Sequence, residues 1–298
     1  MQVIEGLAPA KVNLSLFVTG LRADGYHLLE SAVVFAGVGD RLRVERADAL
    51  RLTVSGPRAA GVPTDGRNLV LKAAERLRSL RKIEAGAHIS LEKHLPHGGG
   101  IGGGSSDAAT AIKLLAQLWN VAPLSAEEAL PLGADIPVCL AAPQPSLMRG
   151  IGETVEPLPP LPPAWLVLVN PGVEMPTPRV FKAFDALYDP TPLRHEPLRD
   201  KADFQDLLVW SLGQFNDLTK VLTDSHAPVY APQIEAILTQ LRASAGCADA
   251  DMSGSGSTCW GLYESAADAQ NAATKLASAH PEWWVAAAPI LGPQDAAA

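Results

Sequence analysis

The chain has 298 residues, of which 47% are hydrophobic, and carries a formal net charge of −8 at pH 7. This length favours two domains or one large α/β unit. The negative charge argues against a nucleic-acid surface, and the absence of a run of about 18 apolar residues argues against a membrane span.

Apolar periodicity predicts alternating strands and helices in the first half of the chain. Period-two alternation predicts strands at residues 12–18, 41–45, 50–54 and 87–91. Helical spacing predicts helices at 68–80 and at 105–119, and Asn68 has the side chain of an N-cap. On the first strand, Lys11, Asn13 and Ser15 share one polar face.

A proline-rich segment, EPLPPLPP at 156–163, contains five prolines in eight residues and predicts a domain joint. The expected domains are therefore residues 1–158 and 159–298. A PxxP-type peptide ligand is the alternative for this segment. Beyond it, the pattern predicts a strand at 165–169, helices at 204–222 and 232–243, and a strand at 259–263 after the stretch SGSGST.

The stretch HGGGIGGGSSDAA, residues 97–109, places six glycines at 98–104. Each glycine costs about 0.5–1 kcal/mol relative to alanine in ordered structure. A Rossmann site fails because Glu127 and Glu128, at the expected distance, lie in a helix start (SAEEAL). A Walker loop fails for lack of the Gly-Lys-Ser/Thr lysine, and a protein kinase for lack of H-R-D and D-F-G.

The remaining interpretation is a backbone cradle for an anion. Successive glycine N–H groups can turn inward as a nest, and the dipole of a helix beginning near Ser105 adds to it. Ser105 and Ser106 can cap that helix or donate to phosphate oxygens. A flexible linker is the alternative, but the strand and helix predicted on either side do not have linker composition.

With these motifs in order, the chain resembles the GHMP kinases, named for galactokinase, homoserine, mevalonate and phosphomevalonate kinases. The resemblance rests on APAKVNL at 8–14, PHGGGIGGGSSDAA at 96–109 and MSGSGS at 252–257. It implies a two-domain α+β fold, with an N-terminal ribosomal protein S5 domain 2-like half and a C-terminal ferredoxin-like half. It also implies phosphoryl transfer from ATP with Mg²⁺.

Five further motifs resemble the family members that phosphorylate the 2-hydroxyl of a CDP-linked methylerythritol in the non-mevalonate isoprenoid pathway. They are ADGYH at 23–27, LGADIP at 132–137, RGIGE at 149–153, the set Pro171-Gly, Pro176-Thr-Pro178 and Phe181, and NDL at 216–218. Another acceptor, such as homoserine or mevalonate, is the nearest alternative. A nucleotide-binding paralogue without catalysis is an alternative of another class.

The resemblance implies that Asp135 is the catalytic base and that Lys11 lies beside it, stabilising the charge that shifts toward the transferred phosphoryl group. From the residues alone, Asp135 would be a helix cap before Pro137. Asn13 would bind the methylerythritol hydroxyls. Tyr26 and Phe181 would sandwich the cytosine ring, while His27 would bind the polar edge of that ring.

On the ATP side, the resemblance implies contacts along the glycine stretch and from three flanking residues. These are Pro96, His97, Gly98, Gly99, Gly100, Ile101, Gly102, Gly103, Gly104, Ser105 and Ser106, with Asn68, Leu69 and Lys93. Two positions depart from the commonest pattern: Asp107 replaces asparagine and His97 replaces a hydrophobic residue. A carboxylate at Asp107 would weaken nucleotide binding unless magnesium or the helix N-terminus offsets it.

The remaining residues predict the setting of the enzyme. Four histidines (His94, His195, His226 and His280) have no shared spacing, so no metal cluster is expected and Mg²⁺ would arrive with ATP. Three cysteines without metal-ligand spacing, and an N-terminus unlike a signal peptide, predict a reducing cytoplasm. We expect no nucleic-acid or membrane partner, and a monomer or weak homodimer.

Overall fold

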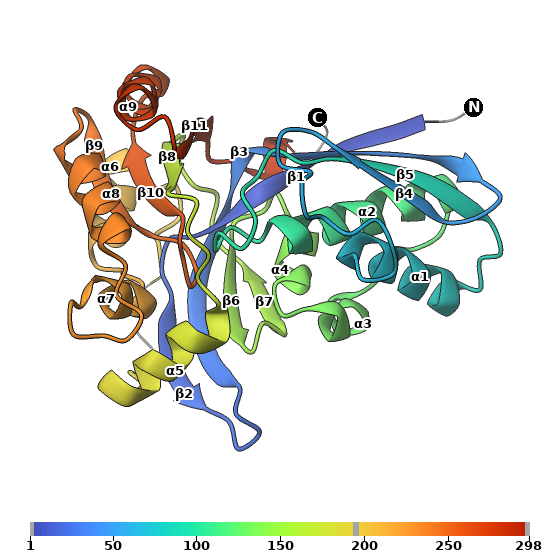
Figure 1. The fold of residues 1–298 in the computed structure, drawn as a ribbon, viewed down its shortest axis with the longest axis horizontal. Coiled ribbons are helices and arrows are strands. Elements are labelled where there is room, and N and C mark those ends of the chain that lie inside the picture. Colours follow the sequence, from blue (N-terminus) through green and yellow to red (C-terminus); the bar gives the residue numbers. More distant parts are fainter. Residues whose placement is uncertain (1–2, 193–196, 296–298) are drawn as a thin grey trace.

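The computed structural model describes residues 3–192 and 197–295. It contains two β-sheets with helices packed against each, an α+β arrangement as predicted (Figure 1). The strands are β1 (Val3–Asn13), β2 (Phe17–Leu21), β3 (His27–Ala47), β4 (Arg51–Ser55), β5 (Gly86–Glu92), β6 (Ser146–Gly150), β7 (Thr154–Pro157), β8 (Trp165–Asn170), β9 (Cys247–Met252), β10 (Cys259–Tyr263) and β11 (Trp284–Pro289). The helices are α1 (Leu69–Arg81), α2 (Gly103–Trp119), α3 (Ala126–Ala129), α4 (Ile136–Ala141), α5 (Thr177–Leu187), α6 (Phe204–Leu212), α7 (Asp217–Thr223), α8 (Pro232–Ala243) and α9 (Ala266–Ala279), with 3₁₀ turns at Leu130–Leu132 and Pro293–Asp295.

The larger sheet is organised around the long strand β3. It has seven strands in the order β4-β5-β3-β6-β7, and β1 and β2 also pair with β3. All pairs are antiparallel except β4 with β5. Because β3 is 21 residues long, its two ends can serve different partners: its first residues pair with β2 and β6, and its last with β5.

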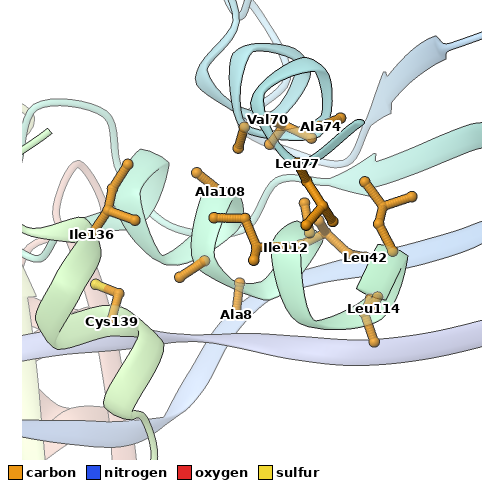
Figure 2. Packing of buried hydrophobic residues seen from close by; sticks show 14 of the residues in the cluster. Ala8, Leu42, Val70, Ala74, Leu77, Ala108, Ile112, Leu114, Ile136 and Cys139 are labelled. Atoms are coloured by element: carbon orange, nitrogen blue, oxygen red, sulfur yellow. The ribbon is translucent and has the colours of Figure 1, made fainter. Parts of the chain in front are cut away.

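Helices α1 and α2 cover one face of this sheet. The inward face of α2 is rich in alanine, which lets it approach both β1 and α1 closely. Figure 2 shows Ala108 and Ile112 of α2 between Leu77 of α1 and Ala8 of β1. The buried cluster extends to Ile136 of α4. The same core therefore packs against both α2 and the helix that follows Asp135.

The smaller sheet has the order β11-β8-β10-β9 and is antiparallel. Helices α8 and α9 pack against it (Figure 1). A further buried cluster joins the two sheets, with Val12 and Val34 on one side and Leu168 and Trp260 on the other. The indole N–H of Trp260 donates to the carbonyl of Asn13 at 3.0 Å, so β10 is bonded directly to the end of β1.

Two predicted elements were wrong because a tertiary contact interrupts a continuing apolar pattern. The strand predicted at 12–18 is divided, since β1 ends at Asn13 and β2 begins at Phe17. Between them, Leu16 donates its N–H to the carbonyl of Phe215 at 3.0 Å and forms a bridge with Asn216. The helix predicted at 204–222 is likewise two helices, α6 and α7, with Asn216 capping the second.

The predicted cap of α1 and the predicted bounds of two elements were confirmed. Asn68 caps α1, its side chain accepting from the N–H of Val70, and α8 and β10 have the predicted bounds. Of the three cysteines, Cys139 and Cys259 are buried, whereas Cys247 is half-buried; all three are free. No helix in residues 3–192 and 197–295 is long and apolar enough to cross a membrane.

Candidate active site

One cavity of about 1050 Å³ receives side chains from both sheets and their helices. Most of the residues predicted for the site line it, although they come from distant parts of the chain. They are Lys11, Asn13, Tyr26, His27, Leu69, Gly98, Gly99, Gly100, Gly102, Gly103, Gly104, Ser105, Asp135 and Phe181.

The glycine loop, residues 97–102, enters this cavity between β5 and α2. Three consecutive carbonyl oxygens of the loop accept hydrogen bonds from outside it: Gly99 from Thr258 N at 3.0 Å, Gly100 from Ser253 Oγ at 2.9 Å, and Ile101 from Lys11 N at 3.0 Å. The surrounding protein thus holds these carbonyls, and Gly98, Gly100 and Gly102 have positive φ angles. Successive N–H groups in such a backbone can turn toward one side, as in an anion nest.

Two glycines in the loop meet a specific backbone requirement. Gly100 has φ +74°, and a Cβ there would lie 2.2 Å from the carbonyl oxygen of Ser253. Gly102, with φ 61°, is the N-cap of α2, and no side chain caps this helix. The expected capping by Ser105 or Ser106 is therefore wrong: α2 begins earlier, at Gly103, and its first N–H groups have no intrahelical partner.

Lys11 and Asp135 meet in the cavity across 124 positions of sequence. The Nζ atom of Lys11 lies 3.0 Å from Oδ2 of Asp135. The lysine side chain is 4% exposed and that of Asp135 is 34% exposed, so the pair is buried on one side and open on the other. Asp135 occupies the N-cap position of α4, but its side chain makes no capping bond. Its carboxylate instead accepts a hydrogen bond from Lys11 and lines the cavity.

Asn13 is held rigidly at the end of β1. Its amide Nδ2 donates to Ser31 Oγ at 2.6 Å, and its backbone N–H donates to Ser253 Oγ at 3.0 Å. Ser253 thus bonds both Asn13 and the carbonyl of Gly100. The strand end and the glycine loop are fixed to one hydroxyl.

Aromatic rings gather at another part of the cavity. The ring of His27 stacks on Phe181, with centroids 4.4 Å apart and an interplanar angle of 26°. His27 Nε2 lies 2.8 Å from Oδ1 of Asp185, one turn further along α5. Tyr26 is 59% exposed on the same cavity. A planar ring can stack on either exposed aromatic surface.

Six predicted ATP contacts do not line the cavity: Asn68, Lys93, Pro96, His97, Ile101 and Ser106. Ser106 donates its hydroxyl to the carbonyl of Pro9 at 2.7 Å and is buried. The ring Nε2 of His97 lies 2.6 Å from the carbonyl oxygen of Arg58, and the amide of Asn68 is used in capping α1 and in a bond to Pro63. These side chains support the loop and its neighbours rather than facing the cavity.

Lys93 explains the presence of Asp107. Its ammonium lies between two carboxyl groups, 2.7 Å from Asp107 Oδ2 and in contact with Asp40 Oδ2. All three side chains are buried. Asp107 therefore faces inward to a cation, and not outward toward the cradle as the sequence suggested. Burial raises the pKa of Asp107 to about 8 despite the lowering effect of Lys93.

Sequence reasoning missed four residues that line the cavity, Glu174, Met175, Lys182 and Asp185, together with Asp40 beneath the loop. Gly254 and Ser255 also line the cavity; the sequence pointed to their motif, MSGSGS, without giving either residue a role. The α5 members had a usable signal, since Lys182 and Asp185 follow Pro178 and Phe181 at helical spacing. Asp40 had none, because it is a single acid within a long strand.

Among the described residues, no group of three or more His, Cys, Asp or Glu side chains is placed to hold a metal ion. His195, one of the four histidines without shared spacing, lies outside the described residues.

Two family descriptions match the chain: GHMP kinases N terminal domain over residues 68–145 and GHMP kinases C terminal over residues 197–282. A protein of Jannaschia sp. (strain CCS1) named 4-diphosphocytidyl-2-C-methyl-D-erythritol kinase is 54% identical over 96% of this chain and 97% of its own length. A protein of the same name from Paramagnetospirillum magneticum (strain ATCC 700264 / AMB-1) is 49% identical over 95% of this chain and 97% of its own length.

Solved structures of GHMP kinases are also similar to this chain. A crystal structure of 4-(cytidine 5'-diphospho)-2C-methyl-D-erythritol kinase superimposes with a TM-score of 0.75 at 31% identity, covering 97% of this chain and 100% of that chain. A homoserine kinase from Cytophaga hutchinsonii superimposes with a TM-score of 0.63 at 18% identity, covering 97% of this chain and 95% of that chain. The second likeness concerns the fold alone.

Proposed function

Since the chain belongs to the GHMP kinases, we propose that its cavity transfers the γ-phosphoryl group of ATP to the 2-hydroxyl of 4-(cytidine 5'-diphospho)-2-C-methyl-D-erythritol. This is a step of the non-mevalonate route to isoprenoid precursors. The chain is an ATP-dependent kinase, and relatives that are 45–54% identical over nearly their whole length bear the name of this activity. Homoserine or mevalonate as acceptor is not favoured.

The transfer exchanges one P–O bond for another. The acceptor oxygen forms a bond to the γ-phosphorus while the bond from that phosphorus to the oxygen of ADP breaks. The acceptor's O–H bond breaks as well, and we assign its proton to the carboxylate of Asp135, the acid that faces the cavity beside Lys11. A positioned base of this kind contributes about 10²–10⁴-fold.

Lys11 serves both partners of the reaction. Its ammonium compensates the charge of Asp135 at 3.0 Å, and its own backbone N–H holds the carbonyl of Ile101 in the glycine loop. A Cβ at Gly102 would lie 3.2 Å from the Cβ of Lys11, so the lysine stem passes directly against the loop. We assign the ammonium to the developing charge on the transferred phosphoryl group.

The phosphates of ATP are assigned to the glycine loop and the first turn of α2. This placement needs no Walker lysine, because main-chain N–H groups and the helix dipole supply the favourable field. It also reconciles an anionic ligand with a chain of net charge −8. Gly104 and Ser105 line the cavity at that turn, and nothing lies within 4 Å of a Cβ built at Gly104.

The cytidine end of the acceptor is assigned to Tyr26, His27 and Phe181. In the structure His27 covers one surface of the Phe181 ring, so a cytosine must stack on a remaining aromatic surface or displace the imidazole. Asp185 holds the imidazole by its Nε2 atom, which fixes the direction of the ring. Asn13, which lines the cavity, is assigned to the methylerythritol hydroxyls.

We expect Mg²⁺ to enter with the ATP phosphates. Magnesium usually keeps several waters and binds through one or two carboxylates plus substrate phosphates. Asp135 is the carboxylate nearest the reacting groups in this assignment, and it is already paired with Lys11. When bound, the ion would neutralise charge on the β- and γ-phosphates.

The observation that supports this function best is the convergence of Lys11, Asp135, the glycine loop and the aromatic cluster on one cavity. An acceptor panel with purified protein, ATP and Mg²⁺ tests it. We expect turnover of the CDP-linked methylerythritol and none of homoserine, mevalonate or methylerythritol phosphate. Phosphorylation of an acceptor without the cytidine group would overturn the substrate assignment, and no turnover of any acceptor would favour a non-catalytic paralogue.

Three related expectations stay predictions. We propose a domain boundary between residues 158 and 159, a monomeric or weakly dimeric state, and a cytoplasmic location.

A further inference from the structure

The glycine loop has a buried attachment at each of its ends. Lys93 immediately follows β5, before the loop, and Asp107 lies in the second turn of α2, after it. The Nζ atom of Lys93 bonds Oδ2 of Asp107 at 2.7 Å, joining two residues 14 positions apart. The loop is therefore closed at its base by a direct contact between side chains.

Asp40 completes this closure from the sheet beneath. One of its carboxylate oxygens contacts Lys93 Nζ, and the other accepts the backbone N–H groups of His94 at 2.6 Å and Leu95 at 2.9 Å. The segment that leads into the loop is thus bonded to β3. A Cβ at Gly103 would lie 3.6 Å from Lys93 Nζ and 3.8 Å from Asp40 Oδ2, so the cluster lies directly under the start of α2.

The geometry points to a positioning role: we infer that Asp40, Lys93 and Asp107 form a clasp that holds the glycine loop in its ATP-binding shape, without touching ATP. The inference rests on the proposed function because it takes the loop as the phosphate site. It replaces the expectation that the Lys93 ammonium contacts the nucleotide. All three side chains are at most 5% exposed, and none lines the cavity.

The electrostatic balance of the clasp favours this role. Burial, the largest effect, raises the pKa of Asp107 to about 8, so this carboxyl group is mostly protonated near pH 7. In that form it adds little negative charge beneath the phosphate cradle. One oxygen of Asp107, Oδ1, has no hydrogen-bond partner among the described residues, which also fits an uncharged carboxyl.

A clasp of this kind acts by preorganisation. A loop rich in glycine has more conformations to lose than other loops, and each must be lost when ATP binds. Closing the base of the loop in the free enzyme removes part of that entropic cost before binding. Removing the clasp should therefore weaken ATP binding and speed the opening of the loop, while the acceptor end of the cavity is unaffected.

The test compares Asp107→Ala with Asp107→Asn. The asparagine keeps an oxygen that can accept from Lys93, whereas alanine does not. We expect the Kd of a non-hydrolysable ATP analogue, measured by calorimetry, to rise about tenfold or more in D107A and to stay within about threefold in D107N. We expect amide hydrogen exchange of residues 97–105 to accelerate in D107A alone.

Glu128→Gln is the matched control, because it removes a partner of the Arg81 ion pair between α1 and α3, outside the cavity. It should leave ATP affinity and loop exchange unchanged. Lys93→Met serves as a second variant and should accelerate loop exchange as D107A does. Binding of the CDP-linked acceptor, measured without ATP, should remain within about twofold in each folded variant.

Three results would overturn the clasp. They are an ATP affinity and loop exchange in D107A within about twofold of wild type, equal damage by D107N and D107A, or a parallel loss of acceptor affinity. None of these measurements requires turnover. If the wild-type enzyme does not phosphorylate the CDP-linked acceptor, the proposed function fails while the clasp remains testable by ATP-analogue binding.

Discussion

The Nζ atom of Lys11 and Oδ2 of Asp135 lie 3.0 Å apart, with the lysine almost wholly buried and the aspartate open to the cavity. This asymmetry separates their tasks. In the proposed reaction the aspartate would meet the acceptor hydroxyl, whereas the stem of the lysine lies against the glycine loop. From the residues alone, Asp135 would be a helix cap. Its side chain does not cap α4, and it bonds Lys11 instead.

Asp135→Asn should lower kcat by about 10²–10⁴ and leave ATP affinity nearly unchanged, because the amide cannot accept the acceptor's proton. Steady-state kinetics and ATP-analogue binding measure the two effects. Asp203→Asn is the control, since Asp203 is also an N-cap but its side chain does cap a helix, α6. Near-wild-type turnover in D135N would refute the assignment of the base.

Lys11→Met should lower kcat by about 10²–10³, the typical loss when one donor to a transition-state charge is removed. Because Lys11 and Asp135 act as a unit, the double variant should lose far less than the product of the single losses. Lys113→Met is the control: this lysine is half-buried and donates to the carbonyl of Ala142 outside the cavity. Multiplicative losses would show that the two residues act independently.

Tyr26→Ala should raise KM for the cytidine-linked acceptor with little change in KM for ATP. The loss of one stacked base is worth about 1–3 kcal/mol where aromatic stacking has been measured, which predicts roughly a 5- to 150-fold effect. Tyr230→Ala is the control, because Tyr230 is also surface-accessible but bonds Glu235 on α8. An unchanged acceptor KM would remove Tyr26 from the base pocket.

Gly100→Ala should impair ATP binding and stability by more than the preference of glycine for a positive φ angle alone explains. The new Cβ would lie 2.2 Å from the carbonyl oxygen of Ser253, so the loop must move away from the C-terminal half. We expect ATP KM to rise at least about tenfold and Tm to fall. Gly61→Ala isolates the backbone term, since Gly61 has φ +81° and nothing lies within 4 Å of its Cβ. Equal effects of the two variants would contradict the role of the contact.

Asp107 should make the folded state less stable as pH rises. Its carboxyl group keeps its proton in the folded protein up to a pKa of about 8, whereas the unfolded chain releases it near the ordinary pKa of 3.8. The folded state therefore binds more protons between these values, and its stability falls with rising pH across that window. The D107N variant lacks this group. Its free energy of unfolding in urea, relative to that of wild type, should therefore rise from about pH 4 to 8 and then become constant. A constant difference would show that Asp107 is ionised when folded.

The fold could be predicted from the sequence where local pattern and tertiary structure agree. The helix at Pro232–Ala243 and the strand at Cys259–Tyr263 match their predicted bounds. The predictions failed at Leu16 and Gly213, because apolar periodicity continues through both breaks. At Leu16, the partner that ends the strand is the backbone of Phe215 and Asn216, some 200 positions away, and local periodicity carries no trace of it.

The site followed a similar division. Residues that belong to a motif, such as Lys11, Asp135 and the glycines, were predicted to lie together, and the structure brings them to one cavity. Residues that act through burial were misjudged. Lys93 and Ser106 were expected at the ligand but are bonded beneath the loop, and Asp40 was not noticed. Burial depends on the whole chain, so a local motif does not reveal which way such side chains point.

The three hydrogen bonds to the carbonyls of Gly99, Gly100 and Ile101 also restrict which mutations the loop can accept. The three donors are Thr258, Ser253 and Lys11, which lie at different points of the fold. Each carbonyl must therefore keep its position along the loop to meet its own donor. A point substitution disturbs one bond, but inserting or deleting a single residue here would shift the whole register against all three donors. Evolution can therefore vary the chemistry of this loop more readily than its length.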